Sequence, residues 1–400
     1  MSTALRVIAQ RLIAIAAVPL LLIAWCARPL VRFRLCVVGS HRFGHLALEP
    51  EMWLLNRALK PRTNAPYEVD IWSLGSRRVQ SNQYLAQLWA QRLRRPPSWF
   101  VGALVRAGEM LPALALKQAE MSIHGPRNAL DNMPRQCPAA EDFTPSEIAA
   151  MRNAGFDPRE PYVALVVRDA SHYAARGEQE ERSTALLNAD LSKFSHTCEY
   201  LVASGLQVIR LGGPSPQQLV SMDGCFDYAN SHIRSPKLDV KLPFNCRFAI
   251  ATQTGPDAVA LLGRRPVLYV DVLRLSQFFL GTRLATWFPV QFADSQGTNP
   301  WSLERWSSSA LIAAKSPAAF VESGVEFRRC TEVELRDLVE DYVDELESGV
   351  NAEVLQIRGR VSASLQEATN PWGNERFGEI SAPVSRRWLL DNRSWWLQAG

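Results

Sequence analysis

A turn between two glycines carries the first residues suited to acid–base chemistry. The segment Gly39–His45 (GSHRFGH) follows the strand-like run Arg32–Val38 and precedes a predicted helix from about Leu46 to Leu59. It has the glycine spacing of a P-loop, but His45 and Leu46 stand where that motif needs Lys and Ser or Thr. The sequence therefore does not support a nucleoside triphosphatase.

A histidine at this position can act as a general base near neutral pH. The alternative is that the histidine only caps or packs the start of the helix. Glu49 and Glu51, on the same predicted helix, are rival candidates for the base.

Three consecutive predicted strands in the second half of the chain end in polar or small residues. These are Arg168 and Asp169, then Arg210 and Gly212, then Thr252, Gln253, Thr254 and Gly255. Arginines, small residues and a helix start supply the charge, the room and the N–H donors that a diphosphate needs. A single arginine at a strand end is more typical of a surface ion pair, but the repetition on consecutive strands favours a diphosphate site.

Several other chemistries lack their motifs. No GxGxxG follows a predicted strand, which argues against a nicotinamide dehydrogenase, and no HExxH or CxxC is present. The seven cysteines lie at irregular spacing, mostly in apolar stretches, and are predicted to be buried free thiols. We expect no bound metal and no other cofactor.

The composition is that of a globular chain. Its 400 residues are 47% hydrophobic and 21% charged, which predicts two or three domains with a large core. The net charge of +4 is too small to make nucleic acid the expected partner.

Beyond residue 32, short β-rich runs alternate with helical patterns, which predicts parallel sheets covered by helices. We expect an α/β fold with two Rossmann-like domains, 32–140 and 141–348, facing a cleft, and a helical tail over 349–400. The segment Pro126–Pro145 is predicted to be a linker. Capping boxes at Thr144–Glu147 and Thr331–Glu334 predict two helix starts.

Residues 1–31 form a compositional exception. Leu12–Ala27 is an apolar run of 16 residues between Arg11 and Arg28. As a helix it would reach roughly 24 Å, short of a hydrocarbon core of about 30 Å. An anchor lying in the interface of an anionic membrane fits this run, while a tilted span, a signal peptide and a core helix remain alternatives.

Six segments together resemble a family of bacterial glycosyltransferases linked to surface polysaccharide synthesis. They are RFGHLALEPEMWL (42–54), ALVVRDASHY (164–173), ASGLQVIRLGG (203–213), FDYANS (226–231), RFAIATQTGPDAVALLGRRPVLYVDV (247–272) and SGVEFRRCTEVELRDLVEDY (323–342). The likeness covers about residues 30 to 345. It implies a GT-B-like, metal-independent, inverting transferase that moves a sugar from a nucleotide-sugar donor to a surface polysaccharide or lipid-linked acceptor.

The resemblance also implies roles and a location. Arg168, Arg210 and the Thr254–Gly255 turn would hold the donor diphosphate, and the first domain would present the acceptor and the base. The Arg168 strand end also resembles the arginine-bearing strand of fucosyltransferases that use GDP-fucose. The protein is expected on the cytoplasmic side of the inner membrane, as a peripheral or single-anchor protein.

One departure leaves two alternatives open. In the family, the helix after the Arg168 loop opens with Arg-Asn-x-Asp, whereas this chain has Leu187-Asn188-Ala189-Asp190, and Arg182 is a possible substitute. The rivals are a non-hydrolysing sugar-nucleotide epimerase and a catalytically silent scaffold of a polysaccharide assembly complex. The missing arginine favours the scaffold.

Overall fold

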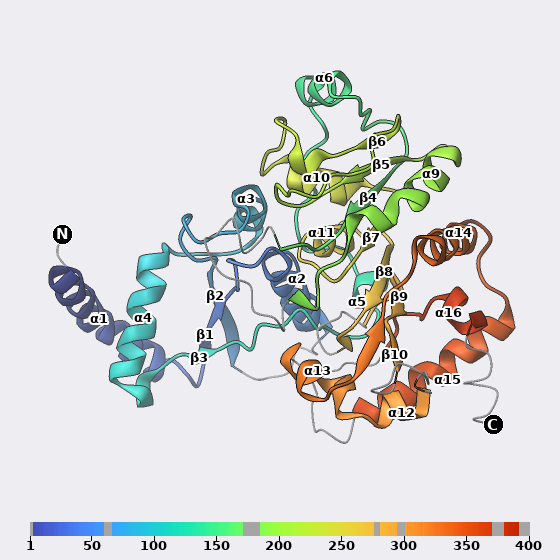
Figure 1. Ribbon diagram of the computed structural model, residues 1–400. Coiled ribbons are helices and arrows are strands. Elements are labelled where there is room, and N and C mark those ends of the chain that lie inside the picture. The colour runs from blue at the N-terminus through green and yellow to red at the C-terminus, as the bar shows by residue number, and fades with distance from the viewer. Residues whose placement is uncertain are drawn as a thin grey trace. The chain divides into compact units, whose positions relative to one another are not determined.

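The chain is a mixed α/β protein with two parallel sheets (Figure 1). A computed structural model describes residues 3–59, 66–170, 185–275, 281–293, 301, 303–314, 316–369 and 380–391. Contacts divide the chain into two compact units. Unit 1 is Met1–Ile123 with Gln136–Ala139, and unit 2 is His124–Arg135 with Ala140–Gly400.

Unit 1 is built around a three-stranded parallel sheet in the order β2-β1-β3. Its elements are α1 (Thr3–Cys26), β1 (Val31–Val37), α2 (Phe43–Leu59), β2 (Tyr67–Ser73), α3 (Gln83–Arg92), α4 (Ser98–Met110), η1 (Pro112–Leu114) and β3 (Lys117–Gln118). Successive residues of a strand face opposite sides of the sheet. Leu35 of β1 therefore packs with α1 and α4, whereas Arg34 lies against Trp53 of α2.

A buried charge cluster joins α2 to this sheet. The Asp70 carboxylate on β2 accepts hydrogen bonds from the Arg34 guanidinium at 2.9 Å, from Arg57 at 2.6 Å and from the Trp53 indole at 2.9 Å. Because all three donors converge on one carboxylate, no partner is left as an unpaired buried charge. The cluster fixes the orientation of α2, which carries His45 and Glu49.

Unit 2 contains a six-stranded parallel sheet in the order β6-β5-β4-β7-β8-β9. Its strands are β4 (Tyr162–Val166), β5 (Gln207–Arg210), β6 (Cys225–Phe226), β7 (Phe248–Ala251), β8 (Val267–Val272) and β9 (Ala285–Pro289). All residues of β4, β7, β8 and β9 are buried, as expected of strands covered on both faces. A separate antiparallel pair is formed by β10 (Gln291–Ala293) and β11 (Glu326–Arg328).

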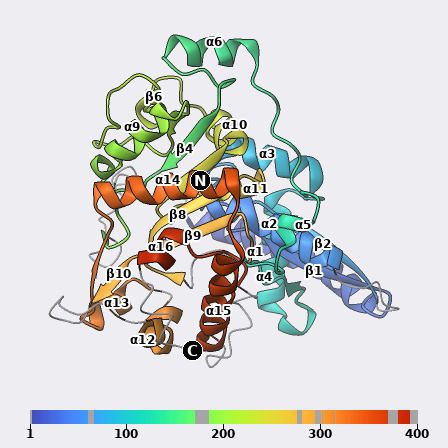
Figure 2. The same cartoon turned by 90° about the vertical axis from the view of Figure 1, so that its right-hand side faces the viewer.

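Helices cover both faces of the large sheet. The helices of unit 2 are α5 (Ala129–Asn132), α6 (Pro145–Asn153), η2 (Leu191–Phe194), α9 (Ser195–Ala203), η3 (Tyr228–Asn230), α10 (Leu238–Asn245), α11 (Asp257–Leu262), α12 (Leu303–Ser308), η5 (Ala310–Ala313), α13 (Ala318–Glu322), α14 (Glu332–Ser348), α15 (Ala352–Thr369) and α16 (Arg386–Asp391). The helices α9 and α14 lie side by side on one face, and α10 and α11 lie on the other (Figure 1). From the side, α14 runs across the face of the sheet (Figure 2).

Both predicted capping boxes are confirmed. Thr144 and Thr331 each accept a hydrogen bond from the backbone N–H three residues on, and Glu147 and Glu334 return the bond to the cap residue. Helix α14 buries Leu335, Leu338, Val339 and Tyr342 at helical spacing, whereas Leu346, near the end of the helix, is exposed.

The segment predicted as a linker is packed and hydrogen-bonded. The Asp131 carboxylate of α5 accepts from the Thr282 hydroxyl at 3.1 Å and from the Arg283 N–H at 3.0 Å. The buried Lys241 ammonium donates to the Asp142 carbonyl at 2.7 Å and to the Glu147 carboxylate at 2.8 Å. The proline and polar residues of this segment therefore indicate an irregular but packed structure and not a flexible linker, because its backbone and side-chain groups form hydrogen bonds with the rest of unit 2.

The cysteine prediction holds for most positions. All seven thiols are free, and Cys36, Cys137, Cys198, Cys246 and Cys330 are buried, while Cys225 is half-buried and Cys26 is exposed. Burial raises the pKa of the Cys246 thiol to about 12, which keeps it protonated and unreactive.

Candidate functional site

The carboxyl ends of β5, β4 and β7 bring together three of the predicted donor-binding segments. Strand β4 pairs with β5 on one side and with β7 on the other, so the residues that follow these strands share one edge of the sheet. The Arg168 N–H donates to the Thr252 hydroxyl at 2.8 Å, which ties the end of β4 to the end of β7. Parallel α/β sheets bind their ligands beyond this edge.

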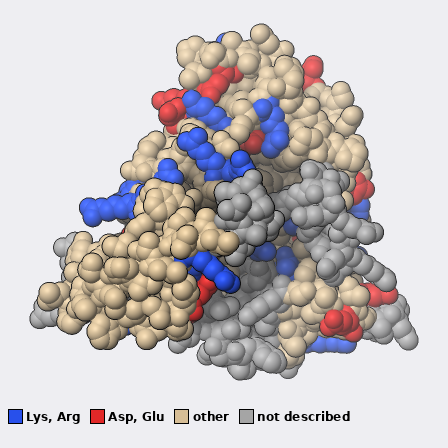
Figure 3. All heavy atoms as spheres, turned by 90° about the vertical axis from the view of Figure 1, so that its left-hand side faces the viewer, with Lys and Arg blue, Asp and Glu red and all other residues tan. Residues whose placement is uncertain are grey.

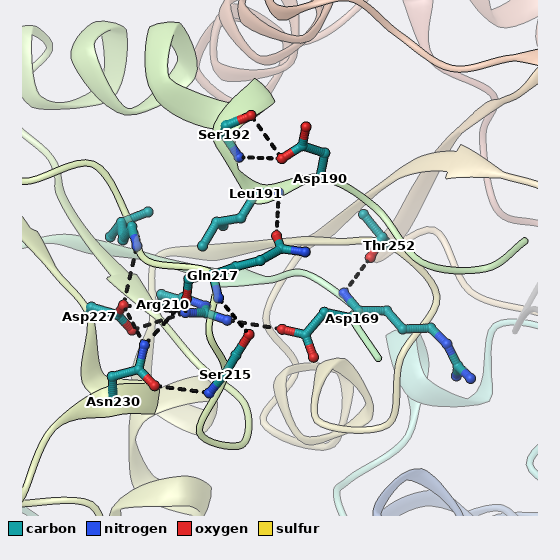
Figure 4. A network of polar contacts seen from close by, with 12 residues as sticks. Asp169, Asp190, Leu191, Ser192, Arg210, Ser215, Gln217, Asp227, Asn230 and Thr252 are labelled. Atoms are coloured by element: carbon teal, nitrogen blue, oxygen red, sulfur yellow. Dashed lines mark hydrogen bonds and ion pairs between the residues drawn. The ribbon is translucent and has the colours of Figure 1, made fainter. Parts of the chain in front are cut away.

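Arg210 is the most buried charged residue of this edge, with 2% of its surface exposed. One guanidinium nitrogen lies 3.2 Å from the Asp169 carboxylate, and another lies 3.3 Å from Asp227 and donates to the Gln217 carbonyl at 2.6 Å (Figure 4). Two carboxylates therefore neutralise this arginine. Tertiary contacts thus supply counter-ions that the sequence did not reveal, and the role of Arg210 toward a diphosphate stays a prediction.

Hydrogen bonds from the Arg210 network also fix the position of the loop that follows β5, at Ser215 and Leu219. The Asp227 carboxylate accepts from the Leu219 N–H at 3.2 Å and from the Asn230 amide at 3.0 Å, and the Asn230 oxygen accepts from the Ser215 N–H at 2.9 Å (Figure 4). Asp227 was not among the predicted site residues. Asp227 directly follows the two-residue strand β6. The other candidates were found because they are polar residues at strand ends, and Asp227 would have been found in the same way if β6 had been predicted.

The predicted Gly212 lies inside this loop. Its φ is +139°, which side chains other than glycine rarely adopt, and a Cβ placed on Gly212 or on Gly213 would meet no atom within 4 Å. The loop therefore presents backbone beside open space, which is what a close approach of a phosphate requires.

At the end of β7, the side chains of Gln253 and Thr254 form hydrogen bonds with neighbouring protein groups. The Gln253 side chain accepts from the Leu273 N–H at 3.1 Å and donates to the Arg274 carbonyl at 2.8 Å, which joins the ends of β7 and β8. The Thr254 hydroxyl donates to the Asp257 carboxylate at 2.9 Å. Both predicted donor residues are thus engaged within the protein.

A buried acid stands at the start of α11, directly after the predicted Thr254–Gly255 cradle. The Asp257 carboxylate also accepts from the Tyr269 hydroxyl at 2.6 Å, and burial raises the pKa of Asp257 to about 6. Helix α11 has only six residues. At the helix start where the sequence predicted a diphosphate-binding turn, the Asp257 carboxylate is hydrogen-bonded to the hydroxyl groups of Thr254 and Tyr269.

Two non-glycine residues at adjacent strand ends adopt left-handed backbone conformations. Gln253, after β7, has φ +49°, and Asp271, within β8, has φ +52° beside a shift in strand register. Each such conformation costs about 1–3 kcal/mol, and these conformations cluster at ligand sites. The side-chain bonds of Gln253 and the bond from the Cys330 N–H to Asp271, 2.9 Å long, hold both in place.

In unit 1, the predicted base and one of its rivals form a pair on α2. His45 Nδ1 lies 2.7 Å from Glu49 Oε1, one helical turn away, and Glu49 Oε2 accepts from the Gly39 N–H at 2.7 Å. Glu49 is buried and His45 is half-buried. An ionised Glu49 can only accept, so the imidazole proton resides on Nδ1 and Nε2 is left as the basic nitrogen.

Glu51 has a different environment from Glu49. Its fully buried carboxylate accepts from the Gln136 N–H at 3.0 Å and from the Cys137 N–H at 2.9 Å, both within unit 1. This geometry gives Glu51 a structural role, because it fixes the segment Gln136–Ala139 against α2. The spacing in the sequence carries a signal that distinguishes the two, because only Glu49 is four residues from His45 and so lies on the same face of the helix.

The segment that departs from the family pattern adjoins Arg168. The Ala189 N–H donates to the Arg168 carbonyl at 2.9 Å, and the Asp190 carboxylate caps η2 by accepting from the Ser192 N–H at 3.0 Å. Arg182, the suggested substitute for the missing arginine, lies outside the described residues.

A hollow of about 600 Å³ lies elsewhere in unit 2, beside β10, α12 and α13. Trp301 and Arg305 line it, with the guanidinium 4.7 Å from the indole ring, and none of the predicted donor residues does. Within the described residues, no group of three or more His, Cys, Asp or Glu side chains is arranged to hold a metal ion.

The chain matches no protein-family model and no curated protein sequence. Three similar solved structures are sugar transferases. A glycosyl transferase family 9 protein from Veillonella parvula has 10% identity and a TM-score of 0.36, covering 74% of this chain and 96% of its own. The ADP-heptose LPS heptosyltransferase II of E. coli has 12% identity and a TM-score of 0.38, covering 77% and 99%. The E. coli heptosyltransferase WaaC with ADP has 10% identity and a TM-score of 0.37, covering 79% and 99%. TM-scores this low do not establish a shared fold.

Proposed function

We propose that this protein is a glycosyltransferase of GT-B type that moves a sugar from a nucleotide-sugar donor to a surface polysaccharide or lipid-linked acceptor. One observation carries the proposal. The carboxyl ends of three adjacent parallel strands in unit 2 bring Arg168, the glycine loop after Arg210 and Thr252 to a single edge, where this class of sheet binds its ligand.

Within this proposal the donor-binding residues divide into two groups. The Arg168 side chain and the backbone N–H groups of Gly212 and Gly213 contact the donor diphosphate. Asp169, Arg210, Gln253, Thr254 and Gly255 position the loops that carry those contacts, because the described side chains among them are engaged with protein groups. The leaving diphosphate is stabilised by protein charge and amides, with no metal required.

The base in this proposal is His45. Its Nε2 takes the proton of the acceptor hydroxyl, the hydroxyl oxygen bonds to the anomeric carbon, and the bond from that carbon to the diphosphate oxygen breaks. Attack opposite the leaving group inverts the anomeric carbon. Glu49 accepts a hydrogen bond from Nδ1–H and so fixes the neutral tautomer whose acceptor nitrogen is Nε2, and it holds the ring in one orientation.

A thermal-shift screen of the full chain against UDP, GDP, CMP, dTDP and ADP sugars tests the proposal first. A selective donor stabilises the native state by mass action, so one nucleotide class should raise the melting temperature. Failure of every nucleotide sugar to shift the melting temperature would argue against any donor-binding function.

The variant Arg168→Ala then tests the donor site. We expect the dissociation constant of the selected donor to rise at least tenfold, about 1.4 kcal/mol. Arg247→Ala is the matched control, since Arg247 precedes β7 at the opposite end of the same sheet and its exposed side chain pairs with Glu347. Equal donor affinity in both variants would remove Arg168 from the site.

The neutralised Arg210 favours one alternative, a catalytically silent scaffold in a polysaccharide assembly complex. A scaffold would show no donor turnover, and the double replacement of His45 and Arg168 would leave glycan production unchanged in cells. The epimerase alternative would convert the donor with no acceptor present, which an NMR time course on donor alone detects.

A further inference from the structure

The apolar N-terminal helix α1 is part of the packed body of unit 1. Small and aliphatic residues recur at helical spacing along one side of α1 and are buried against the core that includes Leu35 of β1 and Leu104 of α4; they are Ala14, Ala17, Leu21 and Ala24. Arg28, just beyond the helix, donates to the Ala115 carbonyl at 3.1 Å. Only four residues separate Cys26 from the first residue of β1.

The opposite side of α1 is apolar and uncovered. Leu12 and Ile23 are 61% and 65% exposed, and Ile8, Ile15 and Leu22 are exposed beside them. Between Ile8 and Cys26 the only charged residue is Arg11. The side of the molecule on which α1 and α4 lie carries a broad area without charged side chains (Figure 3).

Length and composition would allow α1 to cross a membrane, since Ile8–Cys26 passes that test and a helix of 24 residues spans about 36 Å. Packing decides against it. To enter the hydrocarbon core across its whole width, α1 would have to leave α4 and expose Leu35, Val101 and Leu104 to water. A helix with one side on the protein and the other side bare is suited to lie parallel to the membrane surface.

The charge of unit 1 matches an anionic surface. Unit 1 contains 16 Lys and Arg and 6 Asp and Glu, a net charge of +10, whereas unit 2 contains 28 and 34, a net charge of −6. Four of the acids, Glu49, Glu51, Glu68 and Asp70, are engaged by internal hydrogen bonds or ion pairs. The excess positive charge is therefore available to groups outside the chain.

Two of the free cations lie beside residues that pack against the core shared by α1 and α4. Arg94 and Arg95 are exposed, and neither side chain has an ion-pair partner in the described part of the chain. They line a shallow hollow with Ile71 and Phe100, which pack against the core formed with α1 and α4. Asp70 also lines this hollow and is already paired with Arg34 and Arg57. This hollow is suited to a phosphate headgroup beside buried acyl chains.

We infer that unit 1 docks on an anionic phospholipid bilayer, with α1 lying in the plane of the interface and its Ile8–Ile23 side in the acyl region, while Arg94 and Arg95 contact headgroup phosphates. This inference rests on the proposed function only for the lipid-linked acceptor, and not on the transfer reaction. It places the acceptor-binding unit at the surface where a lipid-linked glycan is found.

Vesicle flotation of the full chain tests the docking. With vesicles of phosphatidylcholine and phosphatidylglycerol, Ile15→Glu/Ile23→Glu should lower the partition coefficient at least tenfold, and so should Arg94→Glu/Arg95→Glu. Leu355→Glu, on an exposed position of α15 in unit 2, is the matched control and should bind as the wild type does. Vesicles of phosphatidylcholine alone should bind the wild type at least tenfold more weakly. Wild-type binding by either double variant overturns the inference.

Topology is tested in sealed inverted inner-membrane vesicles with tags at both ends of the chain. A helix lying in the interface leaves both tags open to protease, whereas a spanning helix protects the N-terminal tag, and that outcome overturns the inference. Self-association without lipid that Ile15→Glu/Ile23→Glu abolishes would instead assign the α1 surface to a second copy of the chain. Donor affinity should be unchanged in these variants, so loss of membrane binding and loss of donor binding are separable.

Discussion

His45 and Glu49 form a hydrogen-bonded pair across one turn of α2, with 2.7 Å between Nδ1 and Oε1, and the second oxygen of Glu49 accepts the Gly39 N–H at 2.7 Å. The pair joins the end of β1 to the start of α2. It gives the imidazole one defined orientation, and under the proposed function it makes Glu49 a positioning residue and His45 the base.

Replacing Glu49 by Gln should remove the preference for the Nδ1–H form of His45. A glutamine offers one acceptor oxygen, which cannot serve both Gly39 and His45. We expect turnover with the donor and acceptor identified by screening to fall roughly a hundredfold, with unchanged donor affinity. Two-dimensional ¹H–¹⁵N NMR of the imidazole should show the loss of the single tautomer.

Glu109→Gln, on the exposed surface of α4, is the control for that experiment and should leave both readouts unchanged. An unaltered tautomer in Glu49→Gln would show that the short contact does not set the proton position.

Arg210→Met should destabilise unit 2, because it leaves Asp169 and Asp227 facing each other without their shared cation. Removing one partner of a buried ion pair costs about 3–5 kcal/mol. In a unit of this size we expect the melting temperature to fall by roughly 6 °C or more. Arg247→Ala, which breaks an exposed pair, should cost less than about 1 kcal/mol. Weaker donor binding with little loss of stability would instead make Arg210 a direct donor ligand.

The buried Asp257 predicts a pH-dependent stability with a definite sign. Its pKa rises from the ordinary 3.8 to about 6 in the folded protein, because burial disfavours the charged form. The folded state binds this proton more tightly, so the stabilisation is fully present below about pH 3.8 and is lost as the pH rises through about 6.

The comparison of wild type with Asp257→Asn isolates that contribution. Relative to the variant, the wild type should lose up to about 3 kcal/mol of unfolding free energy between pH 4 and pH 7. Thermal denaturation at a series of pH values measures the difference. A flat difference between wild type and Asp257→Asn would show that the carboxyl group of Asp257 is not perturbed.

Gly263 marks a close approach between two helix ends. A Cβ at Gly263 would lie 2.6 Å from the Phe244 carbonyl oxygen, a backbone atom that cannot rotate away. We expect Gly263→Ala to destabilise unit 2 by about 1–3 kcal/mol. Gly359→Ala, inside α15 with no atom near the added methyl group, should instead stabilise by about 0.5–1 kcal/mol. Chemical denaturation of both variants tests the contrast in sign.

Much of the local structure followed from short-range rules. The strands β4, β5 and β7, which end in the predicted polar and small residues, and the two capping boxes were predicted and are present. Each depends on residues a few positions apart, whose preferences are readable in the chain itself. The order β5-β4-β7 then brought the predicted strand ends to one edge.

What the strand ends do was decided only by tertiary structure. The carboxylates that neutralise Arg210 come from residues 169 and 227, and the group that engages Thr254 is the buried Asp257. A sequence identifies a charge but not its counter-ion, because ion pairs form between residues distant in the chain. Asp227 in particular was not predicted, because the strand that it follows, β6, has only two residues.

The helix α1 shows the same division. The sequence by itself determined an apolar run with basic flanks, and hence an affinity for a non-aqueous environment. Every side of that helix is apolar, so the sequence alone could not say which side would be covered by protein. The packing of Ala17 and Leu21 with Leu104 of α4 decided it, because small and complementary side chains let the two helices approach, and only the side turned away from α4 was left for another partner.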